Sequence, residues 1–385
     1  MEICRKEDCF GCYACSNICP KGCITMNEDN YGYIYPKINM DKCINCNLCK
    51  KVCPAINEDK FNAPNIVFAG WAKKKDERES STSGGAASTF SNIILEESGV
   101  VYGASVVDSE VKHMEVIEKS NISILKGSKY VHSKIEDNYK KCEQKLKSGI
   151  KVLFIGTPCQ ISGLKHFLRR DYENLFTIDI ICHGVPSMKM LNEYLRIEGI
   201  SSDYTNIQFR DENGFNLTVI KDNKKVFVKP MKESLYYLGF MKGVFYRENC
   251  YKCRYAQEKR ISDITIGDFW GLGEEEEFKY SKKGGVSLIL SNTKKGEMLI
   301  NRCKKELCLY KRSLYEAVNG NAQLRKPSIK HKNYYKFRKA YLKKGFVSAT
   351  KKALLNDMLY DKLRDVSKKN EILYAIAKRV KKIIR

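Results

Sequence analysis

One cysteine pattern occurs twice near the start of this chain. A C-x2-C-x2-C-x3-C-P run covers residues 9–20 and returns at residues 43–54. Each run holds three thiolates close enough for three corners of one iron–sulfur cube, while its Cys-Pro turn directs the fourth towards the other cube. Zinc knuckles or a disulfide framework would not explain the duplicated three-residue steps. The pattern therefore predicts electron transfer through two clusters, one on Cys9, Cys12, Cys15 and Cys53, the other on Cys43, Cys46, Cys49 and Cys19.

The remaining composition indicates a multidomain protein of the cytoplasm. The 385 residues suggest roughly two to three domains. The N-terminus has neither the apolar region nor the cleavage site of a signal peptide, so the 17 cysteines are expected to stay reduced. No uncharged apolar stretch approaches the roughly 18 residues that cross a bilayer. Any membrane contact is expected to be peripheral.

Much of the formal charge of +24 lies in the C-terminal tail. Residues 330–385 contain 18 Lys and Arg against four acidic residues. Their apolar residues recur at near-helical intervals, which predicts basic amphipathic helices. These helices either present a solvated face while capping the main domain, or contact an acidic partner or an anionic membrane surface. No known nucleic-acid module surrounds these lysines, so nucleic-acid binding is not expected.

A polar connector at residues 58–64 separates two regions. We expect a dicluster ferredoxin domain at 1–58, a domain at 65–330 and a helical tail at 331–385. The middle region alternates strands with helices, which predicts a mixed α/β fold whose sheet is at least partly parallel. Residues 204–230 read as short antiparallel strands with a turn at Asn213-Gly214. The expected strands are 66–71, 100–107, 111–117, 152–155 and 175–181, with helices at 87–97 and 135–147 and others starting near 160 and 186.

Four further cysteines fall where a ligand of such a sheet would bind. Cys159 directly follows the strand at 152–155, and Cys182 follows the strand at 175–181. Ligands of open α/β sheets bind outside the carboxyl ends of strands, so neighbouring strands would place both thiols in one crevice. Cys250 and Cys253 add a C-x2-C pair. These thiols suit a third cube, but zinc or a redox dithiol would use the same residues. The other cysteines are expected to be buried or incidental thiols: Cys4, Cys23, Cys142, Cys303 and Cys308.

Two resemblances add to this interpretation. Residues 1–58 resemble a bacterial dicluster ferredoxin. From residue 65 to about 300, six segments resemble the family of the beta subunit of the coenzyme F-420 reducing hydrogenase, which includes formate dehydrogenase, sulfite reductase and chlorophyll reductase flavoproteins. The resemblance implies bound FAD and a cluster on Cys159, Cys182, Cys250 and Cys253. The segments are 83–85, 127–131, 156–160, 182–187, 249–256 and 263–271.

A flavin is also expected on chemical grounds. Clusters pass single electrons, organic substrates usually take two, and a flavin can hold either number. Neither G-x-G-x-x-G after a strand nor a P-loop motif is present. Ser83-Gly84-Gly85, which opens a helix, is the predicted pyrophosphate site, with a plain N-cap as the alternative.

Four more residues complete the predicted site. Lys129 and Tyr130 are expected to offer charge and stacking to the flavin, unless they only cover surface, and Thr157 joins the cofactor-binding set. His183, beside Cys182, is the predicted catalytic residue for proton transfer. A packing role for this histidine is the alternative.

These features predict an oxidoreductase. Electrons would pass from a ferredoxin-like donor through the clusters to FAD, and then as hydride to a small two-electron acceptor such as coenzyme F-420, or in reverse. The expected partners are a ferredoxin or a dehydrogenase or hydrogenase subunit. The alternative is a non-catalytic electron-transfer subunit of a larger redox complex.

Overall fold

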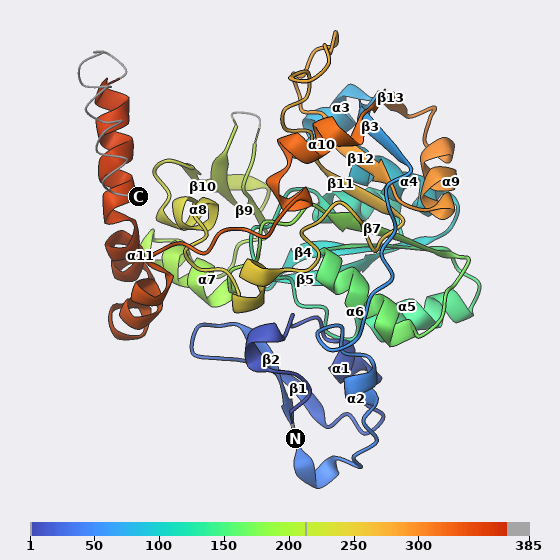
Figure 1. The fold of residues 1–385 in the computed structure, drawn as a ribbon, viewed down its shortest axis with the longest axis horizontal. Coiled ribbons are helices and arrows are strands. Elements are labelled where there is room, and N and C mark those ends of the chain that lie inside the picture. Colours follow the sequence, from blue (N-terminus) through green and yellow to red (C-terminus); the bar gives the residue numbers. More distant parts are fainter. Residues whose placement is uncertain (1, 212–213, 368–385) are drawn as a thin grey trace.

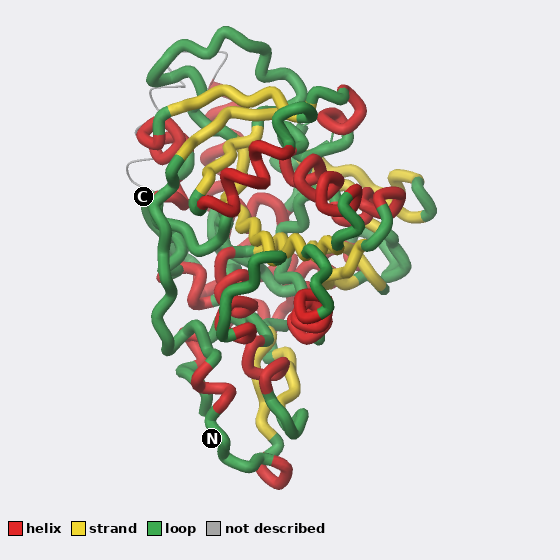
Figure 2. Tube along the Cα trace, turned by 90° about the vertical axis from the view of Figure 1, so that its right-hand side faces the viewer, coloured by secondary structure: helices red, strands yellow, loops and turns green. Residues whose placement is uncertain are grey.

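The two cysteine runs form a small N-terminal lobe below a larger body (Figure 1). The computed structural model describes residues 2–211 and 214–367. In the lobe, β1 (Ile24–Glu28) pairs antiparallel with β2 (Ile34–Ile38). A short 3-10 helix precedes each cysteine run, η1 (Lys6–Asp8) and η2 (Met40–Lys42), and a short α-helix lies within each run, α1 (Ala14–Ile18) and α2 (Leu48–Lys51). Figure 2, from the side, shows the lobe projecting from the body.

The two runs have the same backbone conformation. Gly11 and Tyr13 have positive φ in the first run, and Asn45 and Asn47 take the equivalent positions in the second. This left-handed region suits glycine and asparagine and is rare for tyrosine. In the first run it turns the Gly11 N–H towards the Cys9 Sγ, 3.4 Å away. The sequence repeat is therefore also a structural repeat.

The body is built on a mixed sheet with the strand order β13-β3-β12-β11-β7-β6-β4-β5. The pairs β4/β6, β6/β7 and β7/β11 are parallel, and the remaining pairs are antiparallel. The carboxyl ends of the four parallel strands therefore meet at one edge. The strands are β3 (Ile66–Ala72), β4 (Val100–Val107), β5 (Glu110–Val116), β6 (Val152–Gly156), β7 (Leu175–Ile180), β11 (Ile264–Asp268), β12 (Ser287–Ser291) and β13 (Leu307–Arg312).

Helices bury apolar side chains against both faces of this sheet. On one face, α4 (Ala86–Glu96) and α9 (Lys294–Arg302) share a core with alternate residues of β4, β6 and β7. On the other, α5 (Asn138–Lys147) and α6 (Pro158–Leu168) pack against the intervening residues, and the same core takes in part of the lobe. Shorter helices lie around these layers: α3 (Lys75–Glu79), η3 (Lys119–Leu125), α10 (Leu314–Gly320) and η5 (Ala322–Leu324).

A second, aromatic core lies beside the sheet. It combines side chains of α7 (Met188–Ile197), α8 (Leu235–Met241) and α11 (Tyr334–Ser367), such as Tyr236 and Phe346. The antiparallel strands β8 (Asn206–Gln208), β9 (Asn216–Lys221) and β10 (Lys224–Pro230) form a separate small sheet, and η4 (Glu248–Lys252) follows α8. Gly345 interrupts α11 with a left-handed φ of 73°.

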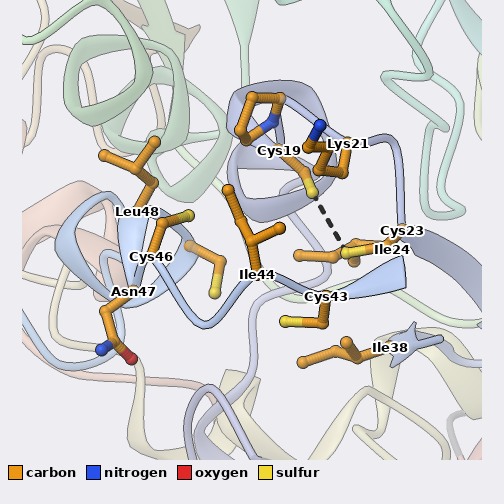
Figure 3. A pocket seen from close by; sticks show the side chains of 12 residues that line it. Cys19, Lys21, Cys23, Ile24, Ile38, Cys43, Ile44, Cys46, Asn47 and Leu48 are labelled. Atoms are coloured by element: carbon orange, nitrogen blue, oxygen red, sulfur yellow. Dashed lines mark hydrogen bonds between the residues drawn. The ribbon is translucent and has the colours of Figure 1, made fainter. Parts of the chain in front are cut away.

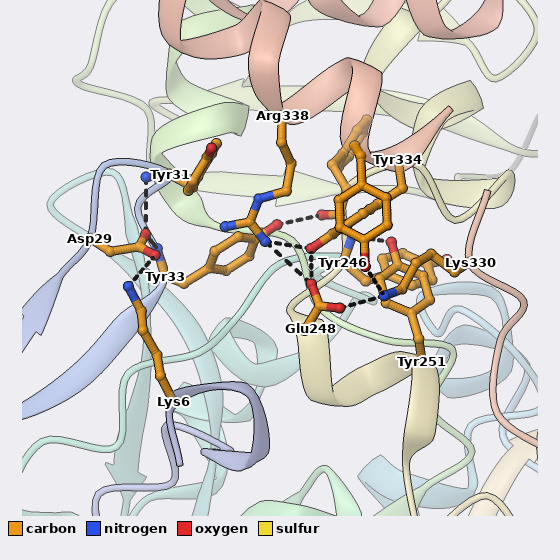
Figure 4. Close-up of polar contacts among 12 residues, drawn as sticks. Lys6, Asp29, Tyr31, Tyr33, Tyr246, Glu248, Tyr251, Lys330, Tyr334 and Arg338 are labelled. Atoms are coloured by element: carbon orange, nitrogen blue, oxygen red, sulfur yellow. Dashed lines mark hydrogen bonds and ion pairs between the residues drawn. The ribbon is translucent and has the colours of Figure 1, made fainter. Parts of the chain in front are cut away.

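Polar contacts join α11, the lobe and η4 (Figure 4). The Arg338 guanidinium lies 3.9 Å from the ring centre of Tyr31 in the lobe. The Tyr33 hydroxyl donates to the carbonyl of Phe245 at 2.9 Å. In η4, Glu248 accepts hydrogen bonds from Tyr334 and Lys330. These contacts fix the hairpin of the lobe against the body.

The structure confirms the mixed α/β fold with a ferredoxin-like N-terminal region and a helical tail. The strand at 100–107 has the predicted bounds, and the strands at 66, 152 and 175 begin as predicted. The predicted turn includes Asn213, which lies outside the described residues. A different turn, between β9 and β10, is formed by Asp222 and Asn223, both with positive φ. The predicted tail residues Ile372, Ile376 and Val380 also lie outside the described part.

None of the helices in the described part of the chain combines the length and the hydrophobicity that crossing a bilayer requires.

Candidate iron–sulfur and cofactor site

The structure brings together the cysteines predicted for one N-terminal cluster. A cavity of about 20 Å³ is lined by Cys19 from the first run and by the first three cysteines of the second run (Figure 3). Cys46 is exposed at this site. The crossed arrangement, in which one run lends its fourth cysteine to the other, is thus present in the fold. The cysteines are Cys19, Cys43, Cys46 and Cys49.

The cysteines predicted for the other N-terminal cluster are all buried. Burial raises the pKa of the Cys12 thiol, and the charges of Cys15, Cys53 and Cys9 raise it further. Cys15 and Cys53 also pack in one buried core of the lobe. Isolated buried thiolates would be costly, whereas iron binding stabilises the deprotonated form. The donor set therefore fits a cluster.

Two thiols that the sequence left without a role lie beside these groups. The Cys23 Sγ is 3.3 Å from the Cys19 Sγ. Hydrogen bonding to Cys53 and Cys9 raises the pKa of Cys4, so its thiol lies next to the other group. No spacing rule marks them, because each reaches its neighbours through the fold. Cys142 and Cys303 are buried elsewhere.

The four cysteines proposed for a third cluster also come together. Cys159 lies in the first turn of α6, Cys182 follows β7, and Cys250 and Cys253 lie in and after η4. Burial raises the pKa of the Cys182 thiol to about 12, and the charges of Cys159 and Cys253 add to the effect. The pKa of Cys250 is raised by burial and then by Cys182, Cys253 and Cys159.

A buried cation balances this group. Arg260 is 2% exposed, and its Nη2 donates to the Asp179 Oδ1 at 2.9 Å. Its charge lowers the pKa of Cys253 against the larger, opposite effect of burial.

In the part of the chain that the structure describes, no three His, Cys, Asp or Glu side chains converge on a single-ion site. A cube distributes its thiolates over four irons, whereas zinc needs all its ligands around one ion. This finding therefore concerns a single-ion site such as zinc and does not concern a cube.

A cavity of about 330 Å³ opens at the carboxyl ends of the parallel strands. This volume lies within the range of small-molecule sites, and the edge is where ligands of open α/β sheets bind. The cavity is lined by Gly103 of β4, Gly156 of β6, Ile180 of β7 and Gly267 of β11. Six of the predicted cofactor and catalytic residues line it as well: Ser83, Gly85, Lys129, Tyr130, Thr157 and His183.

Gly84 lies between the cavity loop and the sheet, where it packs against β3 and β12. A Cβ on Gly84 would lie 2.4 Å from the Gly70 carbonyl oxygen of β3 and 2.8 Å from the Ser287 nitrogen of β12. The Gly84 carbonyl also accepts a hydrogen bond from the Ala72 N–H at 2.7 Å. Gly84 therefore lets the loop pack directly on the sheet, and is not among the residues that line the cavity.

The N-terminus of α4 faces the cavity with free hydrogen-bond donors. Its N-cap, Gly85, has a left-handed φ of 84° and supplies no side-chain cap. The Ser83 Oγ is buried without a hydrogen-bond partner. By contrast, Thr157 and Gln160 close a capping box on α6. The end of α4 is therefore the better anion site, because its N–H groups are not already bonded to a cap.

Lys129 brings an amine to this cavity, and no carboxylate among the described residues pairs with it. Its Nζ donates to the backbone carbonyls of Lys126 at 2.7 Å, Leu125 at 3.3 Å and Ile124 at 3.4 Å. Burial lowers the pKa of Lys129 to about 7. An anion bound nearby would favour the charged amine.

Tyr130 and His183 both line this cavity. The Tyr130 ring already stacks on Phe240 at 4.5 Å and on Phe209 at 4.8 Å, so it is a wall of the cavity more than a free stacking face. Burial lowers the pKa of His183, while Asp268 opposes the shift. His183 is therefore neutral near pH 7.

Several polar residues at this cavity carried no signal in the sequence. His113 has its Nε2 2.9 Å from the Ile155 carbonyl oxygen and its Nδ1 2.8 Å from the Ser133 Oγ. At the rim, Arg210 donates to Asp268 at 2.7 Å. Isolated residues of these types are common in strands and loops, so only their convergence in the fold reveals them.

The fold and the cysteine sites define an iron–sulfur electron-transfer protein of the oxidoreductase class. Residues 8–56 match the 4Fe-4S dicluster domain. Residues 149–316 match the C-terminal domain of the coenzyme F420 hydrogenase/dehydrogenase beta subunit. These matches confirm the family resemblance predicted from the sequence motifs.

Two known proteins were found to be similar to this chain. The chain is 25% identical over 312 residues to the coenzyme F420-dependent sulfite reductase of Methanocaldococcus jannaschii, covering 78% of this chain and 46% of that protein. The chain thus spans about half the length of this curated relative. A chain of the F420-reducing [NiFe] hydrogenase complex from Methanosarcina barkeri aligns with a TM-score of 0.46 and 15% identity, over 69% of this chain and 93% of that one.

Proposed function

We propose that the chain is an iron–sulfur flavoprotein that passes electrons between a redox partner protein and a small two-electron acceptor. In this proposal the dicluster domain at 1–58 receives electrons, and the domain at 65–330 holds a third 4Fe-4S cluster and FAD. The described part of the tail, residues 331–367, caps that domain. The direction of transfer depends on the potentials of the two partners.

The observation that carries the proposal is the position of the third cysteine group beside the large cavity. The Thr157 hydroxyl, which lines the cavity, is 3.2 Å from the Cys159 Sγ. Ile181 and His183, the neighbours of Cys182 in the chain, line the cavity too. A cluster on these cysteines would therefore adjoin whatever molecule binds in the cavity.

FAD is the cofactor that we propose for this cavity, because the polar groups at its edge suit a pyrophosphate. Bound there, it would supply the exchange between one-electron and two-electron steps. The free N–H groups of α4 and the Ser83 hydroxyl would hold its pyrophosphate, and Lys129 would add a counter-charge. His183, neutral near pH 7, would accept or donate a proton at its ring nitrogen close to the reacting atoms. The proposed substrate is a hydride acceptor or donor, with coenzyme F420 as the first candidate.

The arrangement of the lobe favours one order of transfer. The group that contains the exposed Cys46 lies where a partner can approach it. The other N-terminal group adjoins the body, because a Cβ on Gly163 of α6 would lie 3.1 Å from the Cys12 Sγ. The first turn of α6 carries Cys159 of the third group. Electrons would therefore pass from the exposed cluster to the inner one and then to the third.

A non-catalytic electron-transfer subunit is the second candidate. It is favoured by the length comparison, since this chain matches only 46% of the sulfite reductase. The sulfite chemistry of that relative is accordingly not assigned to this chain. The two candidates differ in one result: only the enzyme reduces a small hydride acceptor without another subunit.

The first test is the iron, acid-labile sulfide and flavin content after anaerobic purification, with EPR of the reduced protein. We expect about twelve irons and one FAD per chain, from three cubes of four irons each. About eight irons and no flavin, after anaerobic reconstitution with iron, sulfide and FAD, would contradict the proposal and leave the dicluster domain alone. Turnover with coenzyme F420 then separates the enzyme from the subunit.

A further inference from the structure

Arg247 is a buried cation between the lobe and the body. The residue is 1% exposed. Its Nη1 and Nη2 are buried and have no hydrogen-bond partner among the described residues. Burying a guanidinium without satisfying its donors is costly. A guanidinium buried with unbonded N–H groups therefore indicates that these groups face a negatively charged group.

The main chain of Arg247 is hydrogen-bonded to segments that carry cysteines of the third group. Its N–H donates to the Val185 carbonyl at 2.9 Å, in the loop that contains Cys182. Its carbonyl accepts from the Cys250 N–H at 3.0 Å. The backbone of Arg247 therefore joins two segments that carry cysteines of this group.

The side chain of Arg247 reaches the first cysteine run of the lobe. Its Nε donates to the Cys9 carbonyl at 2.7 Å, and the guanidinium lies 4.2 Å from the ring centre of Tyr35. A Cβ on Gly11 would lie 3.1 Å from Nη1, so a glycine here leaves room for the guanidinium. The unbonded Nη1 and Nη2 atoms thus lie beside the loop Cys9 to Cys12, at the inner cluster of the dicluster domain.

The local charges agree with this position. His132, packed beside Gly11, adds no second positive charge, because burial and then Arg247 lower its pKa to about 3. Arg247 therefore supplies the positive charge next to the inner cysteine group.

We propose that Arg247 raises the reduction potential of the inner cluster, held by Cys9, Cys12, Cys15 and Cys53, through hydrogen bonds from Nη1 and Nη2 to its sulfur atoms. One electron arriving from the exposed cluster adds one negative charge to this site, and a fixed cation in a buried environment stabilises it. The guanidinium stays protonated, so no proton accompanies the electron. Arg247 is a positioning residue that favours inward transfer.

Arginine suits this role better than lysine. Its planar fork can bond the Cys9 carbonyl through Nε and still present the four N–H donors of Nη1 and Nη2, whereas a lysine amine is a single, strongly hydrated point charge. The donors also lie on a side chain whose backbone is anchored in the third group. The same residue therefore sets both the charge at the inner cluster and its attachment to the body.

The test is an EPR-monitored redox titration of the whole protein with the variants Arg247→Gln and Arg247→Lys. For Arg247→Gln we expect the reduced-to-oxidised ratio of the inner cluster at fixed potential to fall about tenfold, a shift of about 59 mV to lower potential for a one-electron couple. The exposed cluster should keep its potential. Arg247→Lys should lie between the glutamine variant and the wild type. Arg302→Gln on α9 is the matched control and should change nothing.

A second measurement covers the case in which these variants lose the inner cluster. In wild-type protein labelled with 15N-arginine, pulsed EPR of the reduced inner cluster should show coupling to guanidinium nitrogen. Unchanged potentials in an iron-replete Arg247→Gln variant, or no such coupling in the wild type, would overturn the proposal. The inference concerns a cluster of the dicluster domain, and its link to the third cluster rests on the proposed function. An iron count of eight would therefore reject the third cluster without deciding the role of Arg247.

Discussion

At the scale of single residues, Lys129 is poised to change charge in the physiological pH range. Burial lowers its pKa to about 7, and no carboxylate offsets that burial. A bound pyrophosphate would favour the protonated amine, so binding should take up a proton wherever the free lysine is neutral. We expect the affinity for FAD to be highest below pH 7 and to fall as the pH rises above it. Fluorescence titration of the apoprotein between pH 6 and 9 measures this.

Two variants separate the charge of Lys129 from its shape. Lys129→Arg keeps its charge across the range, so its FAD affinity should no longer vary with pH through this group. Lys129→Met should bind about tenfold more weakly below pH 7, which corresponds to about 1.4 kcal/mol. Equal affinity of the methionine variant and the wild type at pH 6 would show that Lys129 does not contact the cofactor.

Asp59 provides a second test at this scale. It accepts hydrogen bonds from Ser162 at 2.5 Å, Tyr255 at 2.9 Å and Arg254, and its Oδ1 lies 3.1 Å from the His166 Nε2. Burial alone would raise the pKa of Asp59, but the hydrogen bonds from His166 and Ser162 and the charge of Arg254 outweigh it and lower the pKa. The ionised carboxylate thus ties the connector between lobe and body to α6.

The stabilisation from Asp59 should depend on pH in one direction. A lowered pKa in the folded state means that its contribution is complete above the unfolded value of about 3.9 and is lost as the pH falls through the folded value. We expect Asp59→Asn to cost about 2 kcal/mol at pH 7 and much less near pH 3. Thermal unfolding of both proteins at the two pH values tests this, and a pH-independent difference would exclude the carboxylate.

At the scale of elements, the sequence predicted those strands and motifs whose signals lie within a few neighbouring residues. The strand at 100–107 is a continuous apolar run, and the repeated cysteine steps predicted the lobe, because both signals lie within a few residues. The partners of Cys4, Cys23 and Arg247 were not predictable, since each reaches across the fold. The position of Gly84 shows the same limit: its contact with Gly70 depends on how β3 and β12 pair, which no local pattern contains.

The helix α11 shows how such long-range packing carries stability. Phe346 is fully buried and packs against Phe245, Tyr236 and Tyr194. Phe346→Ala should therefore destabilise the protein by about 3–5 kcal/mol, as expected for a buried aromatic residue. Leu359, on the same helix but 51% exposed, is the control, and its alanine variant should stay within about 0.5 kcal/mol of wild type. Chemical denaturation of both variants measures this, and similar losses would mean that α11 packs differently.

At the scale of the whole molecule, the exposed cluster site lies in the part of the lobe that carries exposed positive charge. Lys42 and Lys51, neighbours of its cysteines in the chain, are exposed. Ile44, between Cys43 and Cys46, is 56% exposed and lines the same cavity. An apolar centre within a basic surface suits an acidic redox partner, because the charges steer the encounter and the apolar contact excludes water. This site is therefore the expected docking point of the donor.

Charge reversal tests this docking point. We expect Lys42→Glu/Lys51→Glu to slow reduction by an acidic ferredoxin about tenfold at low salt, because two favourable charges become unfavourable. The difference should shrink near 1 M salt, where the Debye length falls to about 3 Å. Reduction by dithionite, a small reagent that needs no docking, should be less affected.

The matched control Lys304→Glu/Lys305→Glu changes the net charge equally, at exposed lysines before β13. Stopped-flow absorbance records the rates, and equal slowing of both double variants would assign the effect to net charge and reject the docking point.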